Sequence, residues 1–214
     1  MSATTPPARA YHRLVTSGWD RLAAIYNNPL AQRLAYRPPQ DEIIARLRRT
    51  GARRIADVGC GTGILATRVQ QELHPEVVYG CDASPGMLRQ AKARCAQVNW
   101  VNRRAEDLGL PAASVDAVVS THAFHFFDQP GALAEFHRIL TPGGLLAIVV
   151  INPRSRFAPL LQPTAVQGVA YFPPPAEMRA LVEAAGFDVV EQRPVRRPLP
   201  PALIPDLLTV ARNG

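Results

Sequence analysis

Between residues 53 and 151, short apolar segments alternate with segments of helical spacing, and this alternation constrains the fold more than any other feature. The pattern predicts strands at 53–58, 76–81, 98–102, 115–121 and in the apolar run at 145–151. Helices are predicted between them, at about 62–73, 86–96 and 130–140. Strands separated by helices form crossover units, so the predicted fold class is α/β, with a mainly parallel sheet covered on both faces.

The segment before this core is predicted to be helical and interrupted. The residues from Trp19 to Leu34 suggest short helical pieces, and Pro38-Pro39 are predicted to mark a turn. Apolar spacing then predicts a helix at 41–49. We therefore treat residues 1–40 as a tail and helical cap, and residues 41–214 as the main body of the same domain.

The segment after the core is less regular at first. A stretch rich in proline at 153–175 leads to a predicted helix at 176–185, which ends at Gly186. Two more strands are predicted at 187–193 and 206–212, on either side of a second proline-rich stretch.

The composition is that of a globular domain. At 214 residues and 47% hydrophobic content, the chain can bury a substantial core. Its longest apolar run, Leu145 to Ile151, is far shorter than the roughly 20 residues that cross a bilayer, and its first residues lack a secretory signal. Cys60, Cys81 and Cys95 have no C-x-x-C spacing, which argues against disulfides and zinc. We therefore expect a cytoplasmic protein with no transmembrane segment and no metal.

The positive charge of the chain is concentrated near its N-terminus. Of a formal charge of +7, residues 1–54 hold ten arginines against three carboxylates, while the other 160 residues hold 14 basic and 14 acidic groups. This cluster could attract an anionic partner, either RNA or a membrane surface. The alternative is coding bias, since Lys92 is the only lysine in the chain.

The sequence ADVGCGTGILA at 56–66 places Gly59, Gly61 and Gly63 between the first predicted strand and the next helix. Glycine has no Cβ, so a ligand can approach such a turn closely, and the free N–H groups at the helix start favour a carboxylate or phosphate. About twenty residues later the second strand ends at Asp82, whose carboxylate can accept both hydroxyls of a ribose. Together these features predict a ligand that contains a nucleoside.

Glycine turns of this kind occur in proteins that bind two kinds of nucleoside ligand. Dinucleotide sites carry G-x-G-x-x-G, and this chain has Ile64 where the third glycine would stand. Four blocks instead resemble, in order and spacing, motifs of the class I S-adenosylmethionine-dependent methyltransferases, and in particular their type-11 group: DVGCGTG, GCDASPGML at 80–88, ASVDAVVSTHAFHFFD at 113–128 and EFHRILTPGGLLAI at 135–148. This resemblance, which covers residues 19–212, implies a Rossmann-like, seven-stranded, mostly parallel sheet with an N-terminal helical cap.

The resemblance implies a cofactor, S-adenosylmethionine, whose product is S-adenosylhomocysteine. The glycines would admit its methionine part, Asp82 would bind its ribose, and Asp57 would lie near its amino group. For Asp57 the alternative role is to order the glycine turn, and Leu88 is an alternative to Met87. The residues implied to contact the cofactor are Asp57, Gly59, Cys60, Gly61, Gly63, Asp82, Ala83, Met87, Ala105, Glu106 and Thr121.

One block departs from the family pattern. The type-11 group has a Gly-Asp-Ala-Glu-like run after the third strand, whose acidic residue reads adenine, and here Arg104 occupies that acidic position. Ala105 and Glu106 still match. The resemblance therefore implies that adenine is read by the backbone N–H of Ala105 and by the carboxylate of Glu106 or Asp107. The alternative is that these two carboxylates are solvated loop charges.

Two histidines are candidate catalytic bases. Methyl transfer from a sulfonium needs alignment and exclusion of water rather than a nucleophile on the protein. A base helps where the acceptor must lose a proton, and histidine suits that role near neutral pH. His122 and His125 follow the fourth predicted strand, at the edge where such sheets bind their ligands. For His125 the alternative is a partly buried residue packed among aromatic neighbours.

The predicted function is methyl transfer to a small, hydrophobic or aromatic organic acceptor. In the type-11 group, acceptor choice lies in the N-terminal helices and after the fifth strand, which here are residues 11–40 and 153–175. The aromatic surfaces in these segments are Trp19, Tyr26, Tyr36, Phe157, Tyr171 and Phe172, of which Trp19, Tyr26, Phe157 and Tyr171 are the candidate acceptor contacts. For each of them the alternative is packing in the core or in a lid. The alternatives are an RNA methyltransferase that uses the arginine-rich segment, a non-catalytic cofactor-binding protein, and an enzyme attached to the membrane surface. The pattern indicates no oligomeric state.

Overall fold

The computed structural model describes residues 36–155, 170–197 and 205–214. The candidate acceptor contacts Trp19, Tyr26 and Phe157, and most of the expected N-terminal cap, lie outside these residues. Within the described ranges, no helix is both long and apolar enough to cross a membrane.

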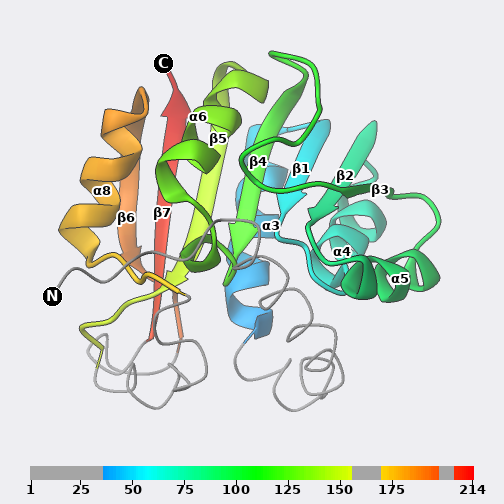
Figure 1. The fold of residues 1–214 in the computed structure, drawn as a ribbon, viewed down its shortest axis with the longest axis horizontal. Helices are drawn as coiled ribbons and strands as arrows, with labels where there is room; N and C mark the ends of the chain where they lie inside the picture. Colours follow the sequence, from blue (N-terminus) through cyan, green and yellow to red (C-terminus); the bar gives the residue numbers. More distant parts are fainter. Residues whose placement is uncertain (1–35, 156–169, 198–204) are drawn as a thin grey trace, which may run out of the picture.

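A seven-stranded sheet forms the centre of the molecule, with the strand order β3-β2-β1-β4-β5-β7-β6 (Figure 1). Neighbouring strands from β3 to β5 are parallel, whereas β7 runs antiparallel between β5 and β6. The prediction of a mainly parallel α/β sheet is confirmed. The strands are β1 (Arg54–Val58), β2 (Val77–Asp82), β3 (Asn99–Asn102), β4 (Val115–Thr121), β5 (Leu140–Ile151), β6 (Phe187–Pro194) and β7 (Asp206–Asn213).

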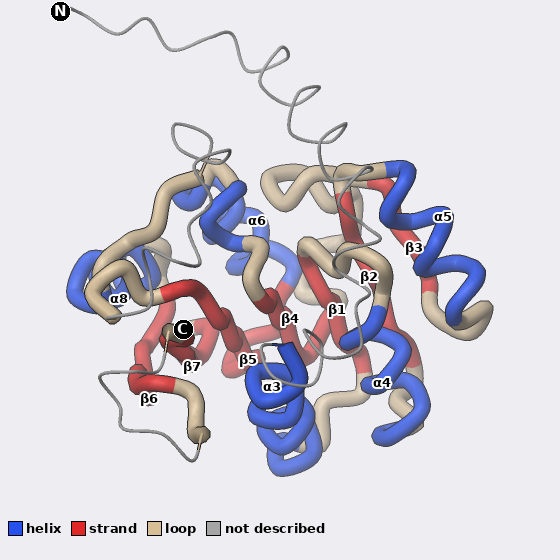
Figure 2. The backbone as a smooth tube through the Cα atoms, turned by 90° about the horizontal axis from the view of Figure 1, so that it is seen from below, coloured by secondary structure: helices blue, strands red, loops and turns tan. Residues whose placement is uncertain are grey.

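Helices cover both faces of this sheet. Figure 2 shows α3 and α4 on one side of the strands and α6 and α8 on the other. Two separate apolar clusters fill the two interfaces: Ile43 and Leu65 lie in one, Leu133 and Phe136 in the other. The helices are α3 (Arg37–Thr50), α4 (Ile64–Leu73), α5 (Pro85–Arg94), α6 (Gln129–Ile139) and α8 (Pro175–Ala184), with a 3-10 turn, η2, at Phe124–Phe126.

The predicted turn at Pro38-Pro39 is wrong. Helix α3 begins at Arg37, so both prolines lie in its first turn. The N–H that proline lacks would have no helical partner there, and its restricted φ suits the start of a helix. The predicted apolar side of this helix is confirmed, because Ile43, Ile44 and Leu47 are buried.

Gly63 lets strand β3 pack against the helices beside it. A Cβ at Gly63 would overlap the ring of Trp100 and would lie 2.8 Å from the Cβ of Ala91 in α5. A Cβ at Gly80 would overlap the same ring. The indole N–H of Trp100 also donates a hydrogen bond to the carbonyl of Cys95, at 2.8 Å. The absent side chain of Gly63 therefore makes room for protein, which corrects the expectation that it faces a ligand.

We expect Gly63→Ala to destabilise the fold more than Gly61→Ala does. Both glycines have a positive φ, 77° and 56°, so alanine at either site costs about 1–2 kcal/mol of backbone strain. Only at Gly63 would the new methyl group overlap Trp100, which adds about 1–3 kcal/mol of overpacking. Urea denaturation of the two variants measures the difference, and equal losses would contradict the packing role.

Candidate functional site

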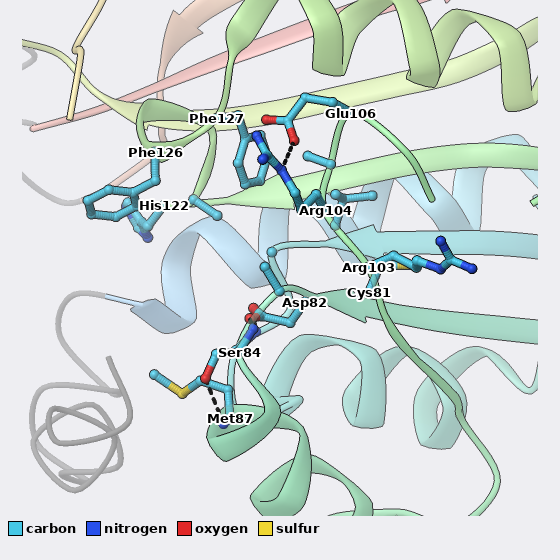
Figure 3. Close-up of a pocket in the computed structure, with 16 residues that line it drawn as sticks. Cys81, Asp82, Ser84, Met87, Arg103, Arg104, Glu106, His122, Phe126 and Phe127 are labelled. Carbon is cyan, nitrogen blue, oxygen red and sulfur yellow. Dashed lines mark hydrogen bonds and ion pairs between the residues drawn. The ribbon is translucent and has the colours of Figure 1, made fainter. Parts of the chain in front are cut away.

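A pocket opens at the carboxyl ends of β1, β2 and β4, where the strand order reverses. Open α/β sheets bind their ligands at this kind of crevice. Figure 3 shows Asp82, Ser84 and Met87 on one side of it, facing His122 and Phe126 across the opening. The pocket therefore joins the segment after β2 to the segment after β4.

The pocket brings together seven of the eleven residues that the sequence assigned to a cofactor. Asp57, Cys60, Gly63 and Thr121 do not line it. The sequence analysis did not name five other lining residues as contacts: Ser84, Arg103, Ala123, Phe126 and Phe127. Ser84 could have been found, because it stands directly before Pro85 at a helix start, a recognisable capping pattern. The assigned residues that line the pocket are Gly59, Gly61, Asp82, Ala83, Met87, Ala105 and Glu106.

Gly59 and Gly61 face different surroundings. A Cβ at Gly59 would overlap that of Ala123 and would lie 3.0 Å from the ring of Phe127, so this glycine lets the segment after β4 approach the turn. A Cβ at Gly61 would have no atom within 4 Å. Of the three glycines in the turn, Gly61 is thus the one whose open side faces the pocket.

Asp82 holds the two loops of this site together. Its Oδ2 accepts a hydrogen bond from the backbone N–H of Gly61 at 2.9 Å, and its Oδ1 accepts one from Ser84 at 2.8 Å. The Ser84 hydroxyl accepts from the N–H of Met87 at 3.1 Å and so caps α5. Each carboxylate oxygen has more than one lone pair, so Asp82 can accept further hydrogen bonds from a ligand in the pocket.

Asp57 is a buried carboxyl group behind the glycine turn. Burial raises its pKa to about 7, the backbone N–H of Ala66 lowers it, and the charge of Asp82 raises it further. Its Oδ2 makes no hydrogen bond within the described part of the chain. A cationic group placed near this oxygen would satisfy it, so the residues present fit a ligand that carries an ammonium group and a ribose.

Of the two acidic residues expected to contact adenine, Glu106 lies at the pocket and Asp107 does not. Glu106 lines the pocket, but its Oε2 lies 2.9 Å from Nε of Arg104 and its Oε1 accepts from the N–H of Asp128 at 2.9 Å (Figure 3). Asp107 is exposed, does not line the pocket, and lies 3.5 Å from a guanidinium nitrogen of Arg103. The carboxylate of Glu106 is therefore the one at the pocket, and it is already engaged by protein donors.

The two candidate histidines occupy different environments. His122 lines the pocket, and its Nε2 lies 2.8 Å from Oδ1 of Asp206. His125 is buried, with its ring stacked on Phe172 at a centroid distance of 4.4 Å, and it does not line the pocket. Burial, and secondly the nearby His122, lower the pKa of His125 to about 3. Such a weak base is poorly matched to proton transfer near neutral pH, so the geometry favours His122.

The aromatic residues at the pocket are not those expected from the sequence. Tyr171 is 54% exposed, donates its hydroxyl to Glu177 at 2.6 Å and does not line the pocket. Phe126 and Phe127 line it instead, next to Ala123. Both come from AFHFFD, a segment that resembles the family's pocket-lining segment after the fourth strand but in which only the histidine had been named as a candidate.

Comparison with known proteins agrees with this geometry. The family model described as "Methyltransferase domain" matches residues 56–148. A demethylmenaquinone methyltransferase of Thermus thermophilus is 31% identical over 165 residues, which are 64% of this chain and 75% of that protein.

Two crystal structures share the fold at low sequence identity. The magnesium protoporphyrin IX methyltransferase of Synechocystis PCC 6803, with bound S-adenosylhomocysteine, has a TM-score of 0.72 at 18% identity and covers 92% of this chain and 95% of its own. The second is the 1,6-didemethyltoxoflavin-N1-methyltransferase of Burkholderia thailandensis, with S-adenosylhomocysteine and 1,6-didemethyltoxoflavin bound. It has a TM-score of 0.72 at 20% identity, and the match covers 99% of this chain and 92% of that protein.

The four motifs, the seven-stranded sheet and the relative of which this chain covers three quarters all lead to one family. The chain belongs to the class I S-adenosylmethionine-dependent methyltransferases, in the type-11 group, and S-adenosylmethionine is its cofactor.

Proposed function

We propose that the pocket holds S-adenosylmethionine on the side of the glycine turn and a small, hydrophobic or aromatic acceptor on the side of Phe126 and His122. The observation that carries this proposal is the division of the pocket. The carboxylate of Asp82, which is bound to the N–H of Gly61, lies on one side, and the ring of Phe126 lies across the opening with His122 (Figure 3). When bound, the cofactor supplies a methyl group already activated by the sulfonium, so the protein has mainly to align the acceptor and exclude water.

Three groups of the chain suit the cofactor. The open side of Gly61 leaves room for the methionine part, and Asp82 lines the pocket with oxygens that can accept from ribose hydroxyls. Behind the glycine turn, the buried Oδ2 of Asp57 has no hydrogen-bond partner among the described residues and suits a cationic amino group. For adenine, Ala105 offers its backbone beside Glu106, whose carboxylate is shared with Arg104.

An acceptor with a flat ring fits the other side of the pocket. Pockets for organic molecules are mostly apolar with a few polar anchors, and here the ring of Phe126 lies beside the imidazole of His122 (Figure 3). The relatives named above act, by their names, on demethylmenaquinone, magnesium protoporphyrin IX and 1,6-didemethyltoxoflavin. All three are ring compounds, which supports the same class of acceptor for this chain.

An RNA acceptor is less well supported. In the part of the arginine-rich segment that the structure describes, four arginines lie close to carboxylates of the same chain. Arg54 pairs with Asp116 at 2.6 Å and Arg53 lies 3.6 Å from Glu76. Arg46 and Arg48 pair with Glu191 and Glu72. Side chains that already have acidic partners contribute less to a phosphate-binding surface.

A methyl-transfer assay with a panel of acceptors tests the proposal. We expect the purified chain to transfer a labelled methyl group from S-adenosylmethionine to quinols or hydroxylated heteroaromatic rings, and not to bulk RNA or to aliphatic alcohols of the same size. Mass spectrometry of the product identifies the methylated atom. Transfer to RNA with none to ring compounds would overturn the acceptor class proposed here.

We expect Gly61→Val to weaken cofactor binding while Gly51→Val does not. Both glycines have a positive φ, 56° and 65°, and both have open space where a Cβ would point. The backbone strain is therefore matched, but only Gly61 lines the pocket. Calorimetry should show at least a tenfold loss of affinity for Gly61→Val alone. Equal affinities in the two variants would show that the turn does not face the cofactor.

We expect Asp57→Asn to change how stability depends on pH. The folded pKa of about 7 lies above the usual 3.8, so the folded carboxyl keeps its proton at a pH where the unfolded one has lost it. Its stabilising contribution is complete below the unfolded pKa and is lost as the pH rises through the folded pKa. The wild type without cofactor should therefore lose stability, relative to the variant, by up to about 1 kcal/mol per pH unit between about pH 4 and 7.

Urea denaturation of both proteins at pH 5, 6, 7 and 8 measures this difference. The two stability curves should diverge up to about pH 7 and run parallel above it. Curves that are parallel throughout would show that the pKa of Asp57 is not raised in the folded protein.

A further inference from the structure

His122 is held by the backbone in an unusual conformation. It is the first residue after β4, its φ is 55°, and its N–H donates to the carbonyl of Val149 in β5 at 2.9 Å. A residue other than glycine pays of order 1–3 kcal/mol for such a conformation and keeps it only where its surroundings impose it. The result is a ring that both lines the pocket and reaches the start of β7.

Asp206, the first residue of β7, is the partner of this ring. It is 3% exposed, and it pairs with Ile151 at the end of β5, which places it beside the carboxyl end of β4. Its Oδ1 lies 2.8 Å from Nε2 of His122, and its Oδ2 is paired with Arg197. Burial alone would raise the pKa of Asp206, but the hydrogen bond to His122 and the charge of Arg197 lower it.

The chemistry of this contact determines the tautomer of His122. An ionised carboxylate has no hydrogen to donate, so a 2.8 Å contact requires that Nε2 carry the hydrogen. In the neutral ring, Nδ1 then has a free lone pair. No residue of the described ranges makes a hydrogen bond to Nδ1, so this nitrogen is left for a molecule in the pocket.

We propose that Asp206 is a positioning residue that holds His122 in the tautomer able to take a proton from the acceptor at Nδ1. The inference rests on the proposed function, because it needs an acceptor that loses a proton from oxygen or nitrogen. That proton passes to Nδ1 as the acceptor atom gains its methyl group. The charge thus placed on the ring is balanced by Asp206, and the proton then leaves to solvent.

The other ionisable groups around this pair leave that balance intact. The ring of Tyr36, before α3, lies edge-on to His122 at 5.3 Å, and burial, then the charge of Asp206, raise its pKa, so it stays neutral. His125 in η2 is neutral as well, with a pKa of about 3. Arg197, from the segment after β6, binds the other oxygen of Asp206. Across the pocket, Asp82 is bound to backbone N–H groups, and Arg104 pairs with Glu106.

The tautomer can be measured without any acceptor. Nitrogen NMR of the full chain labelled in histidine, with His122 assigned through His122→Gln, should show hydrogen on Nε2 in the wild type near pH 8. Asp206→Asn should shift His122 toward the form with hydrogen on Nδ1. Hydrogen on Nδ1 in the wild type would overturn the proposal, even if Asp206→Asn failed to fold.

Kinetics with two acceptors of one ring type tests the consequence. A hydroquinone that is protonated at the assay pH needs a base, whereas a nitrophenol that is already ionised does not. Asp206→Asn should lower kcat for the first acceptor at least tenfold, leave the second within about twofold, and leave the affinity for the cofactor unchanged.

Glu135→Gln is the matched control. It removes a buried carboxylate that pairs with Arg138 in α6, and it does not line the pocket. It should leave both rates unchanged. If Asp206→Asn methylates the protonated acceptor as fast as the wild type, the role of Asp206 is refuted while the proposed function stands. If the wild type methylates neither acceptor, the proposed acceptor class fails in this assay, and the NMR measurement still decides the tautomer.

Discussion

The close approach of protein atoms to both ends of the glycine turn is the constraint on which the rest of this site depends. Gly59 admits Ala123 and Phe127 from the segment after β4, and Gly63 admits Trp100 and Ala91 from β3 and α5. The turn is therefore clamped between the two halves of the sheet. Gly61, between them, is left with its open side toward the pocket, and its N–H is bound by Asp82.

Three aspartates lie at or near this site, and they differ in the groups that bind their carboxyl oxygens. Asp82 is bound by two backbone N–H groups and lines the pocket. Asp57 is buried, one of its oxygens has no hydrogen-bond partner in the described part of the chain, and its raised pKa suits a carboxyl group that becomes charged when a cation binds. Asp206 is held ionised by His122 and Arg197. Burial raises the pKa of both Asp57 and Asp206, so the nearby donors decide which of these two carboxyl groups keeps its charge.

Much of the fold could be predicted because the periodicity of apolar residues reports burial directly. The strands and helices between residues 53 and 151 agree with the expected boundaries within a few residues, apart from the earlier start of β5 at Leu140. Pro38 and Pro39 were misread because proline suits both a turn and the first turn of a helix. Tyr171 was expected at the acceptor, yet its hydroxyl is bound to Glu177 on the outside, and composition alone does not tell which way an aromatic side chain points.

The sequence by itself determined the α/β class, the family and the residues around the glycine turn, because these depend on local motifs and on the order of those motifs along the chain. Only the tertiary structure decided what each glycine makes room for and which histidine reaches the pocket. It alone paired His122 with Asp206, 84 residues further along the chain. That contact exists because antiparallel β7 returns beside β5 and brings its first residue to the carboxyl end of β4, and no local pattern encodes such a return.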